Sequence, residues 1–175
     1  MNKSYNYPIK YIKYNDEKML PFQYYNLMNF ITIPIRNKRP FIKNWPNLDK
    51  TVEPTYFDDD IALHTGIINN IIVIDVDANN NGIEIFNKLK KEHPKINTPT
   101  YSTPSGGFHM IFQYDDIPTK IKIKLNGERI GWDILSDKHL AICPPSTGYK
   151  WKHGLTLENV SIKKIPKWLK NIIIH

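Results

Sequence analysis

The sequence predicts an α+β domain built on a mostly antiparallel sheet, and three features indicate this fold class. The first is Ile71–Asp77, a continuous run rich in β-branched residues and bounded by turn residues, which is typical of a buried strand. The second is Gly82–His93, where apolar residues recur at helical spacing among lysines until Pro94 ends the helix. The third is a series of strand-like segments after this helix, because strands that follow one another without intervening helices favour antiparallel pairing.

The segments before the central strand are expected to be short. Residues 1–20 are predicted to form an N-terminal tail or edge segment, and residues 21–175 a single domain. The elements expected here are a helix over Tyr24–Phe30, a strand over Phe30–Ile35, a basic loop over Arg36–Pro46, a turn or helix start over Pro54–Asp60 and a strand over Ile61–Thr65. The acidic run Asp58–Asp60 is expected to be a solvated cap or turn rather than a metal site.

The segments after the helix are mostly extended. A lysine at every second position of Ile121–Leu125 suits an edge strand that charge protects from aggregation. The full set expected here is a pair of strands over Thr100–Thr103 and Gly107–Tyr114, the edge strand, a hairpin formed by Ile130–Leu135 and His139–Cys143 with its turn at Ser136–Lys138, and a closing helix over Ile165–Ile173.

Composition limits the classes of protein that this chain can represent. Its 175 residues suit one domain, and a formal net charge of +7 suggests a polyanionic partner such as nucleic acid or nucleotides. Cys143 is the only cysteine, which excludes disulfides within the chain and cysteine-rich zinc sites and favours a reducing, intracellular location over secretion. No uninterrupted apolar run approaches ~18 residues, so the sequence predicts no membrane span.

Asp75 and Asp77 are the first candidate functional residues. Side chains two positions apart in a strand point the same way, with Cα atoms about 7 Å apart, so both carboxylates can reach one divalent cation or a pair of them. A cation would offset their desolvation and their mutual repulsion. The alternative is a strand that ends in a solvated acidic turn, for which the following Ala78–Gly82 is suitable.

Two later segments carry further candidates. In Ser105–His109, two successive glycines would let backbone N–H groups approach a phosphate, and His109 would lie close to this turn. The alternative is an ordinary hairpin turn with a half-buried histidine. Asp133 interrupts an otherwise apolar strand, which is unfavourable unless the carboxylate is paired, exposed at an edge or bound to metal.

Taken in order, these motifs resemble one known family. The Asp75-Val76-Asp77 pair, Ser105–His109, Trp132-Asp133-Ile134 and Cys143–Gly148 are similar to the primase–polymerase domain of the archaeo-eukaryotic primase superfamily, as found at the N-terminus of viral and plasmid primase–helicases. The resemblance runs from about Phe30 to Tyr149. It implies that family's catalytic fold, a mostly antiparallel, RRM-like sheet with flanking helices and a small N-terminal α/β unit.

The resemblance also implies roles for individual residues. Asp75, Asp77 and Asp133 would ligate the catalytic metal, expected as a two-ion Mg²⁺ or Mn²⁺ site without zinc. His109 would contact the phosphates of the incoming nucleotide. The remaining nucleotide-binding residues implied are Ser105, Gly106 and Gly107 in the adjacent turn and, by a looser match, Lys38 and Lys43 in the basic loop.

The activity implied is template-directed nucleotidyl transfer, that is, a DNA primase/polymerase that synthesises or extends primers in replication. Its expected partners are a single-stranded DNA template and NTPs or dNTPs, with a helicase domain or subunit as a further expected partner, since relatives often precede a helicase. Two alternatives stay open: a nucleic-acid-binding module with little chemistry, and a metal-dependent nuclease or phosphotransferase.

Overall fold

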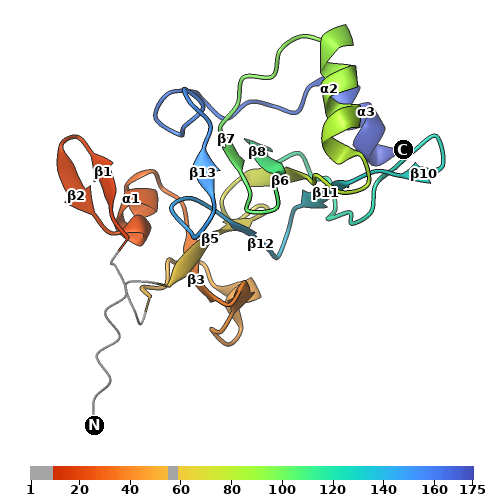
Figure 1. Ribbon diagram of the computed structural model, residues 1–175. Coiled ribbons are helices and arrows are strands. Elements are labelled where there is room, and N and C mark those ends of the chain that lie inside the picture. The colour runs from red at the N-terminus through yellow and green to blue at the C-terminus, as the bar shows by residue number, and fades with distance from the viewer. Residues whose placement is uncertain (1–9, 55–58) are drawn as a thin grey trace.

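The computed structural model describes residues 10–54 and 59–175, which form an α+β fold (Figure 1). Its helices are α1 Pro21–Leu27, α2 Gly82–Glu92, α3 Lys167–Ile174 and the 3-10 turn η1 Trp45–Asn47. Its strands are β1 Ile12–Tyr14, β2 Glu17–Met19, β3 Thr32–Arg36, β4 Arg39–Pro40, β5 Asp60–Thr65, β6 Ile71–Val76, β7 Thr100–Ser102, β8 Phe108–Gln113, β9 Lys124–Leu125, β10 Glu128–Arg129, β11 Trp132–Leu135, β12 His139–Ile142 and β13 Lys150–Trp151.

Two antiparallel sheets carry the described part of the chain. The larger sheet has five strands in the order β11-β6-β8-β7-β13, and the smaller one has four in the order β12-β5-β3-β4. The pairs β1–β2 and β9–β10 form separate hairpins. The predicted α+β class with mostly antiparallel pairing is therefore confirmed, and the RRM-like layout stays a prediction.

The central strand β6 separates two hydrophobic clusters because its side chains alternate between the two faces of the sheet. Ile72, Ile74 and Val76 face the cluster that includes Phe86 of α2 and Leu169 of α3. Figure 1 accordingly shows α2 and α3 together on one side of the larger sheet. No helix in the described residues has the length and hydropathy that crossing a membrane requires.

The opposite face of β6 packs toward the smaller sheet. Ile71 and Val73 belong to a second cluster with Ile61 and Leu63 of β5, to which α1 adds two buried tyrosines. Asp75 follows Ile71 and Val73 at the same two-residue spacing. The face that carries the acidic residues is therefore the one turned toward the smaller sheet, at the end of the strand.

The predicted hairpin of Ile130–Leu135 and His139–Cys143 is wrong. β11 pairs with β6 in the larger sheet, whereas β12 pairs with β5 in the smaller one, so Ser136–Lys138 crosses between sheets. The chain from β5 to β6 makes the same crossing, and the two crossings bind each other: Thr65 Oγ1 donates to Ser136 O at 2.6 Å. Two short strand-like segments joined by turn residues suggest a hairpin, but this pattern does not determine which sheet each strand joins.

The predicted edge strand Ile121–Leu125 is only partly present. Its last two residues form β9, while Lys122 adopts a left-handed φ of 68°, which breaks the extended conformation. As a result Ile121 is exposed and Ile123 is buried.

The predicted helices over Tyr24–Phe30, Gly82–His93 and Ile165–Ile173 and the other predicted strands are present, with ends that differ by up to a few residues. Most of the predicted turn or helix start over Pro54–Asp60 lies outside the described residues. The additional strands that the sequence pattern does not reveal are β1, β2, β4, β10 and β13.

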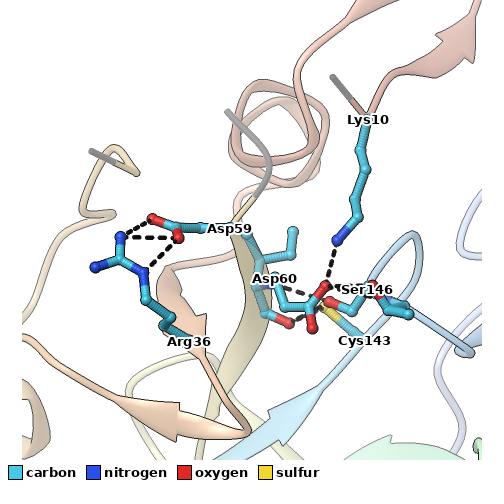
Figure 2. Close-up of polar contacts among 8 residues, drawn as sticks. Lys10, Arg36, Asp59, Asp60, Cys143 and Ser146 are labelled. Carbon is cyan, nitrogen blue, oxygen red and sulfur yellow. Dashed lines mark hydrogen bonds and ion pairs between the residues drawn. The ribbon is translucent and has the colours of Figure 1, made fainter. Parts of the chain in front are cut away.

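Two aspartates anchor the start of β5, contrary to the expectation that this acidic run is a solvated turn. Figure 2 shows them pointing in opposite directions, as successive strand residues do: Asp59 toward Arg36, and Asp60 toward Lys10. The side chain of Asp59 is 4% exposed and accepts hydrogen bonds of 2.9–3.0 Å from the Arg36 guanidinium. Asp58 lies outside the described residues.

The next residue of β5, Ile61, is held by hydrogen bonds from the loop after β12. Ser146 Oγ accepts a hydrogen bond from Ile61 N and donates one to Ile61 O, each 2.9 Å long (Figure 2). The buried Cys143 thiol lies 3.7 Å from the same carbonyl oxygen. The Cys143–Gly148 motif therefore serves first to fasten the loop after β12 to β5.

We predict that Arg36→Met lowers the free energy of unfolding by about 2 kcal/mol, because it leaves the buried Asp59 carboxylate without its guanidinium partner. Methionine keeps the apolar stem of the side chain. The matched control is Arg39→Met, an exposed arginine opposite Arg36 in the β3–β4 pair, which should change stability by less than about 0.5 kcal/mol. Chemical denaturation measures both values, and equal effects would contradict the role assigned to Asp59.

Candidate active site

Three of the predicted site residues form one row across the larger sheet. Asp133 of β11 lies opposite Asp75 of β6, and Asp75 lies opposite His109 of β8. The row continues to β7, where Tyr101 lies opposite His109. Because directly opposite residues of an antiparallel pair point to the same face, these four side chains share one surface of the sheet.

Three side chains of the row, those of Asp75, His109 and Tyr101, lie in contact. His109 Nε2 lies 3.3 Å from Asp75 Oδ1, and His109 Nδ1 lies 3.0 Å from the hydroxyl of Tyr101. His109 and Tyr101 are buried, whereas the side chain of Asp75 is 22% exposed. The row therefore runs from a buried tyrosine outward to a carboxylate that solvent and solutes can reach.

Asp77 completes the acidic group, one step beyond the end of β6 and on the same face as Asp75. Its backbone N–H donates to Gly131 O at 2.7 Å, which fastens it beside the start of β11. Gly131 has to be glycine because a Cβ there would collide with the carbonyl oxygen of Asn79. This close approach holds Asp77 next to the strand that carries Asp133.

The three carboxylates repel one another. Burial raises the pKa of Asp77 above its usual value, and the charges of Asp75 and Asp133 raise it further, while His109 and Arg129 act in the opposite direction. Asp75 Oδ1 is buried and makes no hydrogen bond within the described part of the chain, although His109 Nε2 lies 3.3 Å away. Asp133 Oδ1 accepts a hydrogen bond of 2.7 Å from the backbone N–H of Lys122.

This donor set suits Mg²⁺ or Mn²⁺, which prefer oxygen ligands. Two observations fit a cation bound between the acids. Asp75 Oδ1 is buried without a hydrogen-bond donor among the described residues, and the pKa of Asp77 is raised by burial and by the neighbouring negative charges that a cation would neutralise. Across residues 10–54 and 59–175, however, no three His, Cys, Asp or Glu side chains are arranged to hold a metal ion together as they stand. The predicted metal site therefore stays a prediction that the chemistry of the residues supports.

The glycine turn lies beside the acids, as the sequence motif suggests. Gly107 packs so closely against the end of β6 that a Cβ would collide with Val76 O and lie 3.2 Å from the Cα of Asp77. Gly106 adopts φ +87°, and its N–H already donates to Thr103 O, so this amide is used within the turn. Ser105 is exposed, and its hydroxyl lies 3.1 Å from Thr103 Oγ1.

Lys38 and Lys43 do not join this group. Lys38 lies in the tight turn between β3 and β4, with φ 61°, and Lys43 lies on the loop before η1. Both are exposed, and in the described part of the chain no hydrogen bond or ion pair connects either lysine to the row. Their predicted contact with phosphates has no support from this geometry.

The motifs do not reveal the contact between Tyr101 and His109, although the register of the predicted hairpin could have revealed it. Thr103 N–H donates to Gly107 O, so the β7–β8 hairpin closes between these residues. Counting back two residues on one strand and forward two on the other places Tyr101 opposite His109. A strand aromatic that looks like ordinary core is thus the direct neighbour of the predicted phosphate-binding histidine.

A surface hollow of about 630 Å³ begins at Ala78, directly after Asp77, and extends along α2. Its polar lining includes Asn81, Asn87, Lys88 and Lys91, with Glu84 as the acidic member. Residues 84, 88 and 91 share one face of the helix because they are three or four positions apart.

We predict that Asp77→Asn raises the thermal midpoint of the metal-free protein at neutral pH, because it removes a repelled carboxylate. The sign follows from linkage: a carboxyl group whose pKa is raised by folding favours the folded state at low pH, and that stability is lost as pH rises through the folded-state pKa. Thermal unfolding in EDTA measures the change, with Asp49→Asn, an exposed loop carboxylate, as the control.

The same variant tests the metal. Mn²⁺ should raise the midpoint of the wild-type protein and of Asp49→Asn, and it should raise that of Asp77→Asn by less. If all three proteins respond to Mn²⁺ alike, the ion binds elsewhere and the acidic group is not its site.

A family model described as bifunctional DNA primase/polymerase, N-terminal, matches residues 23–168. No curated protein matches the chain. The matched range covers most of the sequence and contains every member of the row, together with Asp77 and the glycine turn. The family resemblance predicted from the motifs is therefore confirmed.

Proposed function

Because this chain belongs to the Prim-Pol family of bifunctional DNA primase/polymerase domains, we propose that it is a template-directed nucleotidyltransferase that makes or extends primers. Family membership implies primase/polymerase activity in broad terms, with DNA and nucleotides as substrates. The finer proposal concerns which residues of this chain act. The observation that supports it most is the register that brings Asp75, Asp133 and His109 onto one surface of the sheet.

Asp75, Asp77 and Asp133 are proposed to hold divalent metal, as Mg²⁺ or Mn²⁺. When bound, such ions lower the pKa of an attacking hydroxyl and neutralise charge on the triphosphate and the leaving pyrophosphate. The protein's own contribution is to keep three carboxylates at fixed positions: β6 and β11 align two of them, and the bond from Asp77 N–H to Gly131 O fixes the third. The three negative charges repel one another and destabilise the metal-free fold, and the same charges attract a cation.

His109 is proposed to donate an N–H to an oxygen of the triphosphate. Its ring lies beside Asp75 and is held in place by strand pairing on both sides of β8. The turn Ser105–Gly107 lies against the end of β6, so a phosphate near Asp77 would also be near the exposed Ser105 hydroxyl. A donor fixed before the substrate arrives stabilises developing charge at little cost in reorganisation.

The two alternatives differ from this proposal in what the acids are for. A module that only binds nucleic acid gains nothing from three carboxylates that repel one another and the DNA backbone. A nuclease or phosphotransferase could use the same acidic group, and only the product of the reaction separates it from a polymerase. Pyrophosphate release with a growing strand marks a polymerase, whereas shortening of the strand marks a nuclease.

The hollow along α2 is proposed to hold part of the DNA backbone. It begins one residue after Asp77, and its lysines can contact phosphates as point charges without reading the base sequence. The net charge of +7 supports a polyanion as the occupant of a basic surface. A strand that runs along α2 would arrive at the acidic end of β6.

We predict that Asp75→Asn and Asp133→Asn each lower nucleotide incorporation by about 100-fold or more, because each removes a negative charge from the proposed metal site. The assay is incorporation of labelled NTPs or dNTPs on a single-stranded template with Mg²⁺ or Mn²⁺, with and without a primer. Asp49→Asn is the charge-matched control and should keep wild-type activity.

The outcomes separate the hypotheses. Metal-dependent product in the wild type that is lost in both variants supports the nucleotidyltransferase, and the primer and sugar comparisons name its type. Full activity in either folded variant would remove that residue from the site. DNA binding without any product from the wild type would favour the binding module.

We predict that replacing both Lys88 and Lys91 by alanine weakens single-stranded DNA binding and lowers the slope of log K against log salt by about 1.4, or about 0.7 for each lost phosphate contact. The control is Lys164→Ala with Lys167→Ala, two exposed lysines outside the hollow that remove the same charge. Fluorescence anisotropy over a range of salt concentrations measures both slopes. An equal loss of slope in the two double variants would mean that net charge matters and the hollow does not.

A further inference from the structure

Tyr101 is the most deeply buried member of the site row. Its side chain has no exposed surface, and its hydroxyl lies 3.0 Å from His109 Nδ1. Its ring packs edge-on against Trp151, with ring centroids 5.2 Å apart. A buried hydroxyl that is not hydrogen-bonded is costly, so this contact is expected to be made in the folded protein at nearly all times.

The direction of this hydrogen bond decides where the proton of His109 lies. If Nδ1–H donated to the Tyr101 oxygen, the phenol proton would have no acceptor among the described residues, and the lone pair of Nε2 would face the carboxylate oxygen of Asp75. If the phenol donates to Nδ1 instead, the proton of the neutral imidazole lies on Nε2. That nitrogen lies 3.3 Å from Asp75 Oδ1, a buried oxygen that makes no hydrogen bond in the part of the chain that the structure describes.

We propose that Tyr101 is a positioning residue that holds His109 in the Nε2–H tautomer, with the ring's one proton directed toward Asp75 and the outer end of the row. This arrangement gives the phenol an acceptor and leaves the ring's proton on Nε2, the nitrogen that lies 3.3 Å from Asp75 Oδ1. Resting on the proposed function, it also means that His109 presents a donor, and not a lone pair, to a triphosphate oxygen that arrives beside Asp75. A lone pair on Nε2 would repel that oxygen.

The electrostatics of the tyrosine agree with this direction. Burial, with the nearby charge of Asp75 as a smaller cause, raises the pKa of Tyr101 well above its usual value, so the phenol keeps its proton and remains able to donate. The hydroxyl of Tyr149 offers an internal comparison. Its ring centroid lies 6.2 Å from that of His109, and no hydrogen bond joins the two residues.

The test is the tautomer itself. Long-range ¹H–¹⁵N correlation spectra of the metal-free protein at about pH 8 show which ring nitrogen of each neutral histidine carries the proton. The six histidines can be separated by the loss of one set of signals in His109→Gln. We expect the Nε2–H form for His109 in the wild type and in Tyr149→Phe, and a mixture of both forms in Tyr101→Phe, which keeps the ring and its packing.

Either of two results would overturn the proposal: an Nδ1–H form of His109 in the wild type, or an unchanged Nε2–H form in Tyr101→Phe. A kinetic readout accompanies the spectra. Tyr101→Phe should raise KM for the nucleotide by about threefold to tenfold and leave the affinity for single-stranded DNA unchanged. A wild-type protein that incorporates no nucleotide would contradict the proposed function, whereas the spectra would still decide the role of Tyr101.

Discussion

Antiparallel pairing on both sides of β6 is the constraint on which the site depends. Its side chains alternate between a face of Ile72, Ile74 and Val76 and a face that begins with Ile71 and Val73. A slip by one residue would turn all of them to the wrong cluster, so hydrophobic burial fixes the register. Because the acids continue this alternation, the same burial that stabilises the sheet also sets Asp75 between Asp133 and His109.

The clustered carboxylates destabilise the fold at the end of β6, and contacts with neighbouring backbone offset part of this effect. Three carboxylates and a raised pKa at Asp77 would favour separation of β6 from β11. Gly131 allows the loop after β6 to approach closely, and the bond from Asp77 N–H to Gly131 O joins the two strands beyond their last pair. On the other side, Gly107 brings the β7–β8 turn against the same strand end. Glycines therefore surround the acids for reasons of space as much as of chemistry.

The sequence predicts well what depends on local pattern. The β-branched run of β6, the amphipathic α2 with its proline stop and the glycine turn before His109 all carry periodic or turn signals. Sheet membership carries no such signal: β11 and β12 look like a hairpin because only three residues separate them, yet they join different sheets. The same reason hides the ion pair between Asp59 and Arg36, since the two residues lie on segments whose pairing has to be known first.

The single cysteine has a consequence for the chemical behaviour of the molecule. Burial raises the pKa of the Cys143 thiol to about 12, and its sulfur lies against the carbonyl oxygen of Ile61 between β5 and the following loop. Since the thiolate is the form that alkylating agents and oxidants attack, the folded protein should be nearly inert to both. Any reaction at this sulfur would proceed through molecules in which the smaller sheet has opened. The rate of thiol labelling therefore reports local unfolding of this sheet.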